Sequence, residues 1–593
     1  MLALIILSIV LTWLLCAAVC IGNGFLLLKA LRFNCSLTEA LWTGLALFTA
    51  ILQLYHFFRP IDIVAVFLLL GLSLAGWIWN YAVPFPHASA GDASLLKSSA
   101  APRLPLSTLH FQLLNFLLLF IAAVIIAFRC AALGEHYDTG LYGAQAVRWL
   151  ITYPLVPGLG NLLAQLGFNS SVFLCIAALD QGPWRDLAHH LFDGFLIAAI
   201  FASIIPAGLR ILRTESNSSS DWFFTLLLIP ATIWATTSKI VGTNTDLPTS
   251  IVCLAAAATL FRALEQESSR SSASDSRAKN LVIAMVLLSL AVTFKISSVV
   301  FAALGWTVAI LKLWALSRNT PIGKRQLAWA VILSAVIVLP WIGRGVVLTG
   351  YPFFPSAALG IPVEWKVPPS ETQMQADFAR SFARVPELTS EYAHGWKWLR
   401  PWFREMLTER EGFVIPLAFV LAGSVTGIIG LKRRDQSSLP QWLWLLVPSL
   451  GGLIFWFLEA PALRFGEPTM WTAGATLGTF AAVRFLNRPG RNRIAVAGLV
   501  LLTAWAAHPR LFWSSYIRPS VGARTFLRLP EAKLRQHQNV SGLTVNVPVE
   551  TNQCWDAPLP CSPYFDETLH LRKPGELERG FAAEESGRAV KWH

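Results

Sequence analysis

Apolar stretches long enough to cross a lipid bilayer recur along most of this 593-residue chain. A run of about 18 or more apolar residues is a candidate membrane helix. Only 14% of the residues are charged, whereas a soluble domain carries roughly a quarter. The pattern predicts an all-α polytopic transmembrane bundle. It excludes an ordinary soluble enzyme, a disordered chain and a nucleic-acid-binding protein.

About fourteen spans can be placed in the sequence, with edges good to a few residues. They lie near 2–22, 39–57, 61–82, 109–130, 190–212, 222–238, 248–264, 281–294, 297–314, 327–347, 413–431, 441–458, 469–486 and 493–508. The net charge of +13 is explained by the excess of Lys and Arg in loops that stay on the cytoplasmic side of a membrane. Every second short loop is basic, which predicts that both termini lie outside the cytoplasm.

One pair of spans is short and is separated only by Lys295. These two segments, 281–294 and 297–314, form either two helices or one long kinked helix. A single helix would reverse every later loop and turn the basic clusters at 432–434 and 484–493 outward. The alternation of charge therefore favours two spans.

Three regions are expected along the chain. Residues 1–108 form additional N-terminal membrane helices, 109–508 form the transmembrane core, and 509–593 form a small soluble domain outside the cytoplasm. The core carries two large outer loops, 131–189 and 348–412. The tail contains a strand-like stretch at 541–550 and a turn-rich one at 554–565. A bridge between Cys554 and Cys561 is permitted there, because thiols oxidise outside the cytoplasm.

The first outer loop contains Asp138, only a few residues after the end of an apolar helix. A carboxylate at the mouth of a helix bundle is suitably placed for a general base, which takes a proton from an acceptor hydroxyl. Asp246 precedes a later span and would be a second carboxylate facing the same cavity as Asp138. For both residues the plain alternative is capping of the following helix, and both interpretations stay open.

Three basic residues lie close to apolar spans, where a charge is costly and usually pairs or binds an anion. They are Lys295, Arg344 and Arg464. A guanidinium at Arg464 is suited to holding a phosphate through two hydrogen bonds. An ion pair with Glu459 or Glu467 is the alternative.

The remaining sequence features indicate the function less specifically. The Trp-rich segment 396–402 fits an amphipathic anchor on the membrane surface or, alternatively, a surface for sugar stacking. There is no zinc-type His and Cys spacing, no P-loop, no GxSxG and no dinucleotide fingerprint. We therefore expect no cofactor, and nothing supports a divalent metal.

The segment Asp138-Thr139-Gly140-Leu141-Tyr142, followed by Ala146 and Trp149, resembles the first outer loop of the GT-C glycosyltransferases. That superfamily includes protein mannosyltransferases and lipid A aminoarabinose transferases. Its motif is an acid or an Asp-Glu pair after a membrane helix, then an aromatic residue, then a small residue. Longer stretches, HYDTGLYGAQAVRWL, YPLVPGLGNL, LGFNSS and CWDAPLPCSPYF, resemble an uncharacterised bacterial family often labelled LIC_10190-type.

The resemblance implies a GT-C-like fold and a set of site residues. Asp138 takes the position of the catalytic base, and Asp246 corresponds loosely to a second outer-loop acid. The residues expected to contact substrate are Glu135, His136, Tyr142, Lys295, Arg344 and Arg464, the last three at the donor phosphate. Thr139 replaces the second acid of the motif, which puts metal binding at this loop in doubt. Three spans precede the motif where the simple pattern has one.

The resulting hypothesis is an enzyme of a bacterial inner membrane with both termini in the periplasm. It would move a sugar from a polyprenyl-phosphate-linked donor to a glycan, lipid or protein acceptor on the periplasmic face. An O-antigen polymerase or ligase is the nearest alternative and would rely on Arg380, Arg384, Arg400 and Arg404. A transporter or flippase for lipid-linked glycans, and a scaffold without catalytic activity, are the others.

Overall fold

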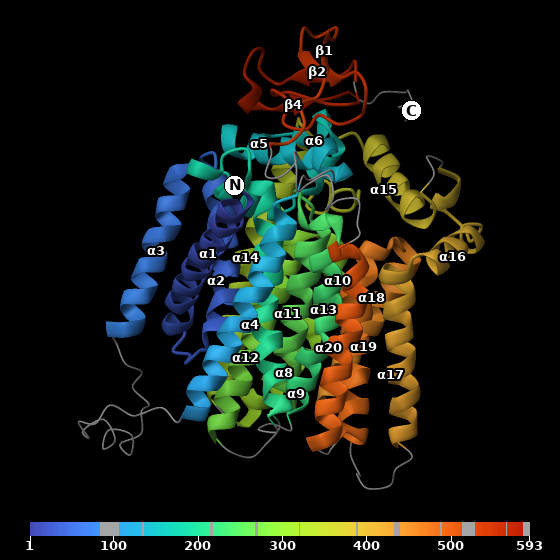
Figure 1. The fold of residues 1–593 in the computed structure, drawn as a ribbon. Helices are drawn as coiled ribbons and strands as arrows, with labels where there is room; N and C mark the ends of the chain where they lie inside the picture. Colours follow the sequence, from blue (N-terminus) through green and yellow to red (C-terminus); the bar gives the residue numbers. More distant parts are fainter. Residues whose placement is uncertain are drawn as a thin grey trace.

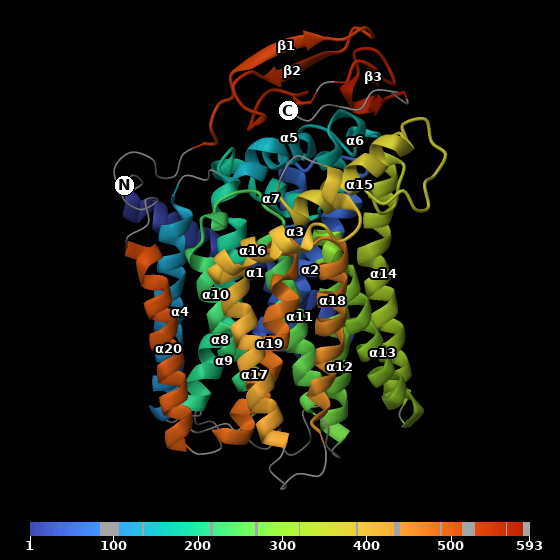
Figure 2. The same cartoon turned by 90° about the vertical axis from the view of Figure 1, so that its right-hand side faces the viewer.

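In the computed structural model, long helices stand side by side in one bundle (Figures 1 and 2). The structure describes residues 1–82, 106–132, 136–213, 218–266, 271–319, 321–386, 390–431, 439–486, 489–512, 528–564 and 566–584. Short helices and the C-terminal strands gather at one end of the bundle, which we call the capped end. Met1 lies at this end too, so the N-terminus and the C-terminal strands share one side, as the charge pattern predicts.

Most of the predicted spans are single long helices. In chain order these are α1 (Leu2–Ala30), α2 (Leu37–His56), α3 (Ile63–Ala82), α4 (Leu106–Cys130), α8 (Phe192–Leu212), α11 (Asp246–Glu265), α12 (Ser271–Phe294), α13 (Val299–Asn319), α14 (Pro321–Thr349), α17 (Ile415–Leu431), α18 (Leu446–Glu459), α19 (Leu463–Phe485) and α20 (Pro489–Phe512). Among the described residues, 11 helices are long and apolar enough to cross a membrane.

Three predicted spans are not among these 11 helices but also lie in the bundle. The stretch 469–486 lies in α19 and 493–508 in α20, which stand beside the other helices (Figure 2). The stretch 222–238 is divided into α9 (Ser219–Leu226) and α10 (Leu228–Thr236). Pro230 lies at the start of α10 and lacks the N–H that a continuous helix needs. An all-helical membrane bundle is therefore the fold of this chain.

The segments on either side of Lys295 are two helices. Helix α12 ends at Phe294, Lys295 has an extended backbone, and α13 begins at Val299. The two helices pack against each other, which a single kinked helix could not do. The charge alternation thus gave the right choice.

Helices α1, α2 and α3 form a closely packed group at the N-terminus. Glycines allow the contact: a Cβ on Gly44 of α2 would lie 1.7 Å from the Cys20 carbonyl oxygen of α1. Small residues at such crossings let membrane helices approach closely. The group is joined to the rest through α2, which also packs against α12 and α14. The stretch 83–108, predicted to separate this region from the core, lies almost wholly outside the described residues.

The capped end is built from the two large outer loops. The first loop forms a π-helical turn, η1 (Thr139–Gly143), and the helices α5 (Ala144–Thr152), α6 (Leu159–Leu162) and α7 (Val172–Leu179). The second forms α15 (Pro369–Arg384) and α16 (Leu399–Thr408). Figure 1 shows α15 and α16 projecting at the side of the capped end, beside α17 and α18.

The C-terminal strands lie over the first outer loop (Figure 1). Strand β1 (Leu534–Gln538) pairs with β2 (Thr544–Pro548) as an antiparallel hairpin, and β3 (His570–Leu571) pairs with β4 (Phe581–Ala582). The predicted strand-like stretch 541–550 is β2. A disulfide joins Cys554 to Cys561. The bridge that the sequence permits is therefore present.

Candidate functional site

Asp138 lies where the first outer loop turns into η1. It is at the N-cap position but makes no capping hydrogen bond. Its Oδ2 atom instead lies 3.3 Å from Nη1 of Arg464. The helix-cap interpretation of Asp138 is therefore wrong, and the carboxylate is paired with a residue 326 positions away.

Asp246 reaches the same arginine from α11. The capping role belongs to Asn244, whose Oδ1 accepts the Leu247 N–H at 3.1 Å. Asp246 accepts a hydrogen bond from the Lys295 ammonium, and its Oδ2 lies 3.7 Å from Nε of Arg464. Asp246 is thus a second carboxylate beside Asp138, as the alternative to capping predicts.

Four charged side chains therefore meet at the capped ends of different helices. We call Asp138, Asp246, Lys295 and Arg464 the charge cluster. The Lys295 ammonium lies 4.4 Å, and the Arg464 guanidinium carbon 5.2 Å, from the centre of the Phe465 ring. A cation over an aromatic face is held without a further counter-charge. The two cations and two carboxylates of the cluster balance formally, which lowers the cost of burying them together.

A small cavity, partly open to solvent, lies beside the charge cluster. Asp246, Lys295 and Arg464 form part of its wall. The rest of its wall comes largely from hydroxyl and aromatic side chains, among them Thr249, Ser250, Ser297, Ser298, Phe301 and Thr469. Cations, hydroxyls and an opening to solvent suit an anionic group such as a phosphate.

The two glutamates near Arg464 have other partners. Glu459 accepts a hydrogen bond from Arg380 at 2.8 Å, and Glu467 accepts one from the Trp234 indole at 2.8 Å. The interpretation of Arg464 as a local ion pair with either residue is therefore wrong.

His136 and Tyr142 lie close to the charge cluster. Burial lowers the pKa of His136, and the nearby Asp138 and Asp246 offset only part of this effect. Burial raises the pKa of Tyr142, and the two carboxylates raise it further. Both side chains are therefore neutral at pH 7. Tyr142 is wedged edge-on between Phe168 and Phe173.

Thr139, where the motif has a second acid, has a structural contact. Its hydroxyl accepts the Thr243 N–H at 3.0 Å. A Cβ on Gly143 would lie 2.1 Å from the Thr243 hydroxyl oxygen. The turn that contains Asp138 is thus hydrogen-bonded directly to the loop that precedes Asp246. The sequence carries no signal for this contact beyond the presence of a small residue at 143.

Arg344 does not join the cluster, which corrects its expected place among the cations around one phosphate. It is buried in α14, where Nη1 lies 2.8 Å from Nδ1 of His56 and Nε donates to the Asn169 side-chain oxygen at 3.3 Å. These contacts join α14 to α2 and to the first outer loop. Glu135, also expected to contact substrate, lies outside the described residues.

The arginines of the second outer loop do not converge on the cavity. Arg384 donates to the carbonyl oxygens of Tyr392, Ala393 and Leu458, and Arg380 pairs with Asp377 and Glu459. Arg400 and Arg404 are exposed on α16. This arrangement gives no common anion site for the four.

The Trp-rich segment divides into two parts. Trp398 and Trp402 are buried and pack against each other and Phe457, so neither presents a free ring to a sugar. Trp396, Leu399, Phe403 and Leu407 are exposed at the spacing of one helical face. This pattern agrees with the amphipathic-anchor interpretation.

Nothing in the described part of the chain gathers three or more His, Cys, Asp or Glu side chains in a way that could hold a metal ion.

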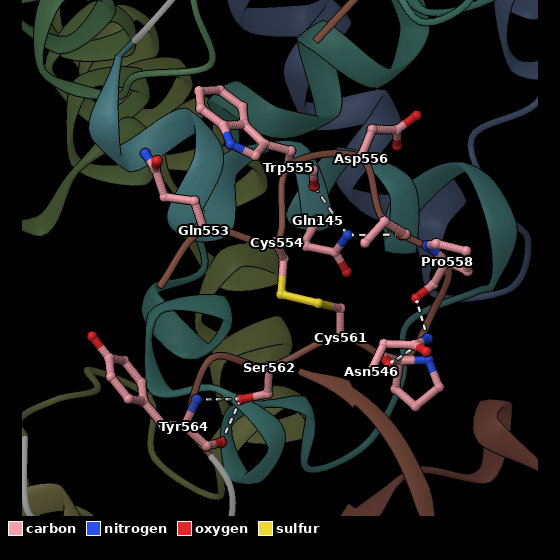
Figure 3. Close-up of a disulfide and its surroundings, with 12 residues drawn as sticks. Gln145, Asn546, Gln553, Cys554, Trp555, Asp556, Pro558, Cys561, Ser562 and Tyr564 are labelled. Atoms are coloured by element: carbon pink, nitrogen blue, oxygen red, sulfur yellow. Dashed lines mark hydrogen bonds between the residues drawn. A yellow bond between two sulfur atoms is a disulfide. The ribbon is translucent and has the colours of Figure 1, made fainter. Parts of the chain in front are cut away.

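The C-terminal strands cover the segment that carries Asp138. Figure 3 shows the disulfide loop lying against α5, where the Gln145 amide donates to the carbonyl oxygens of Trp555 and Ala557 at 3.0 and 2.9 Å. Arg148 of α5 pairs with Asp556 at 2.8 Å. These contacts join parts of the chain about 400 residues apart in sequence. No sequence pattern in either segment predicts them.

Comparison with known proteins gives a family and one distant structural likeness. No curated protein matches the chain. A crystal structure of ArnT from Cupriavidus metallidurans bound to undecaprenyl phosphate is similar at 14% sequence identity and a TM-score of 0.35. The likeness covers 66% of this chain and 64% of that one. The family model for the domain of unknown function DUF8201 matches residues 6–471, which includes the whole charge cluster and ends before the C-terminal strands. The chain belongs to this DUF8201 family.

Proposed function

We propose that the protein is a membrane glycosyltransferase of the GT-C type that uses a polyprenyl-phosphate-linked sugar as donor. The carrying observation is the shared contact of Asp138 and Asp246 with Arg464, beside a small cavity at the capped end. The acceptor is a hydroxyl of a glycan, lipid or protein. The motif resemblance at 138–149 supports the same assignment.

The reaction makes one bond and breaks one. The acceptor oxygen attacks the anomeric carbon of the donor sugar, and the bond from that carbon to the phosphate oxygen breaks. Asp138 takes the acceptor proton as general base. Polyprenyl phosphate departs with the electron pair, and Arg464 and Lys295 stabilise its charge. Such preorganised electrostatic stabilisation is usually the largest contribution to catalysis.

The ion pair between Arg464 and Asp138 is one that a donor phosphate can replace. Arg464 meets Asp138 through a single 3.3 Å contact, and the side chains are 31% and 19% exposed. This pair makes one charge-assisted contact, whereas a guanidinium and a phosphate form two parallel charge-assisted bonds. Donor binding therefore draws Arg464 from Asp138 and frees the carboxylate to act as a base. Asp246 keeps Lys295 in place throughout.

The capped end faces the periplasm in this proposal. The disulfide Cys554–Cys561 lies at that end, and structural disulfides belong to oxidising compartments. Basic residues in the last turns of α8, α11, α13 and α19 lie at the opposite end of the bundle, as expected for the cytoplasmic side. These are Arg210, Arg262, Arg318 and Arg484. Both termini are then periplasmic, and the membrane is the inner membrane of a bacterium.

Reconstitution in vesicles distinguishes sugar transfer from transport of a lipid-linked glycan. The full-length protein is placed in vesicles with a membrane-lipid extract as the source of donor and acceptor, and the products are analysed by mass spectrometry. We expect a new glycosidic linkage together with released polyprenyl phosphate. Asp138→Asn should abolish both. Asp377→Asn, a carboxylate at the same end but outside the cluster, is the matched control and should leave both intact.

Two outcomes reject the proposal. Movement of a lipid-linked glycan across the vesicle without a new linkage identifies a transporter. Transfer that survives Asp138→Asn but fails when Arg400 and Arg404 are substituted identifies an enzyme that works from the second outer loop.

A further inference from the structure

The loop 552–561, which contains the disulfide, forms hydrogen bonds to the chain on both sides of Asp138. The Gln553 side-chain amide donates to the Tyr137 carbonyl oxygen at 3.1 Å. The Trp555 N–H donates to the Gly140 carbonyl oxygen at 2.8 Å, and Asn552 donates to the Tyr137 hydroxyl. One short loop therefore bonds to the residue before Asp138 and to a residue two positions after it.

The backbone of the loop is shaped for this contact. Trp555 has a φ of 48°, a left-handed conformation that is unfavourable for a bulky residue and persists only where the surroundings hold it. In this conformation its N–H meets Gly140 while its carbonyl oxygen accepts the Gln145 amide at 3.0 Å. Trp555 is thus held between η1 and the start of α5.

The disulfide closes the loop that carries these groups. Cys554 and Cys561 are fully buried and seven positions apart. The Asn546 N–H donates to the Pro560 carbonyl oxygen at 3.0 Å, which ties the loop to β2. Figure 3 shows the bridge directly behind the residues that face Gln145. The covalent link restricts the conformations that the loop can adopt.

The segment that the disulfide loop contacts is a π-helical turn with a glycine at the point of contact. Residues Thr139–Gly143 form a π-helical turn, a form that is rare and often found at functional sites. A Cβ at Gly140 would lie 2.7 Å from the Gln553 amide nitrogen and 2.8 Å from the Trp555 ring. Only glycine at this position permits such a close approach of the loop.

We propose that the disulfide loop 552–561 is a positioning element of the site, with Gln553 and Trp555 as the positioning residues. They hold the Tyr137–Gly140 turn so that the Asp138 carboxylate faces Arg464. The role of Asp138 in transfer rests on the proposed function, but the mechanical coupling of loop and turn does not.

Hydrogen–deuterium exchange of the full-length protein tests the coupling. Gln553→Ala removes one hydrogen bond, worth about 1 kcal/mol, so amides of 137–145 should exchange about five-fold faster. Gln553→Glu keeps the shape, removes the donor and places a negative charge opposite the Tyr137 carbonyl oxygen, so exchange should rise at least as much. The double variant Cys554→Ser/Cys561→Ser should accelerate exchange there by more than ten-fold.

Ser562→Ala is the matched control. Its hydroxyl lies in the same domain and 3.0 Å from the Leu162 carbonyl oxygen, away from the Asp138 turn. This variant should leave exchange at 137–145 unchanged. Unchanged exchange at 137–145 in both Gln553 variants and in the double cysteine variant would overturn the proposal.

A functional measurement separates positioning from general stability. In Gln553→Glu we expect sugar transfer to fall at least five-fold, while the Kd for polyprenyl phosphate and the melting temperature stay unchanged. Transfer equal to wild type would show that the turn is not positioned through Gln553 and would overturn the role. Failure of Asp138→Asn to alter transfer rejects the proposed function alone, since the exchange experiment does not depend on activity.

Discussion

Replacing Arg464 by lysine tests whether the site needs the planar guanidinium or only a positive charge at this position. In the structure the Arg464 fork reaches Asp138 through Nη1 at 3.3 Å and Asp246 from Nε at 3.7 Å. One ammonium cannot span both directions with the same geometry. In the proposed complex, lysine likewise cannot make the two parallel bonds to a phosphate.

The size of the effect follows from one lost charge-assisted hydrogen bond. Such a bond contributes roughly 1.5–3 kcal/mol, which corresponds to about 10- to 150-fold in Kd. The Arg464 side chain is 31% exposed, and solvent screening weakens charged contacts at exposed sites. We therefore expect Arg464→Lys to weaken polyprenyl phosphate binding by about 10- to 30-fold.

Binding is measured by titrating polyprenyl phosphate into the purified full-length protein in lipid nanodiscs. Arg484→Lys is the matched control, because Arg484 lies in the last turn of the same helix α19, at its other end. It should leave the Kd unchanged. A Kd for Arg464→Lys within two-fold of wild type would refute the assignment of Arg464 to the phosphate.

Three further predictions concern residues around the site. Arg344→Leu should lower the free energy of unfolding by roughly 1–3 kcal/mol, because His56 loses its buried donor, yet leave phosphate binding unchanged; thermal melting and the titration above check both. Gly143→Ala should abolish transfer, since the added Cβ would lie 2.1 Å from the Thr243 hydroxyl oxygen and push the two carboxylate-bearing loops apart; wild-type transfer by this variant would contradict the close contact. Burial raises the pKa of Asp180 to about 7, so the loop 180–188 should be most stable below about pH 4 and lose stability as the pH rises to about 7. Exchange rates of that loop, corrected for intrinsic pH dependence, should show this loss in wild type and not in Asp180→Asn.

The sequence predicts the depth of the site residues well. Hydropathy and the alternation of basic loops place Asp138, Asp246, Lys295 and Arg464 at helix ends on one side of the membrane, and the structure joins these four. Arg344 has a similar position near the end of a span, yet it pairs with His56 instead. The reason is that span patterns locate a residue along the membrane normal but not around the bundle.

Contacts between distant segments are the part that the sequence could not supply. The partner of Arg464 is not Glu459 or Glu467, three to five positions away, because Arg380 and Trp234 occupy those carboxylates. The docking of the disulfide loop on Gly140 depends equally on packing between remote segments. A bridge between Cys554 and Cys561 is predictable from the sequence, because these cysteines are only seven positions apart.

The most direct test of transfer through the charge cluster is complementation of a deletion strain. The strain carries wild type, Asp138→Asn or the control Asp377→Asn at equal membrane levels, and its envelope glycans are compared by mass spectrometry. We expect one sugar to be missing from the deletion and from Asp138→Asn, and to be present with wild type and Asp377→Asn. An envelope from Asp138→Asn identical to wild type, with the sugar missing only from the deletion, would contradict transfer through the charge cluster.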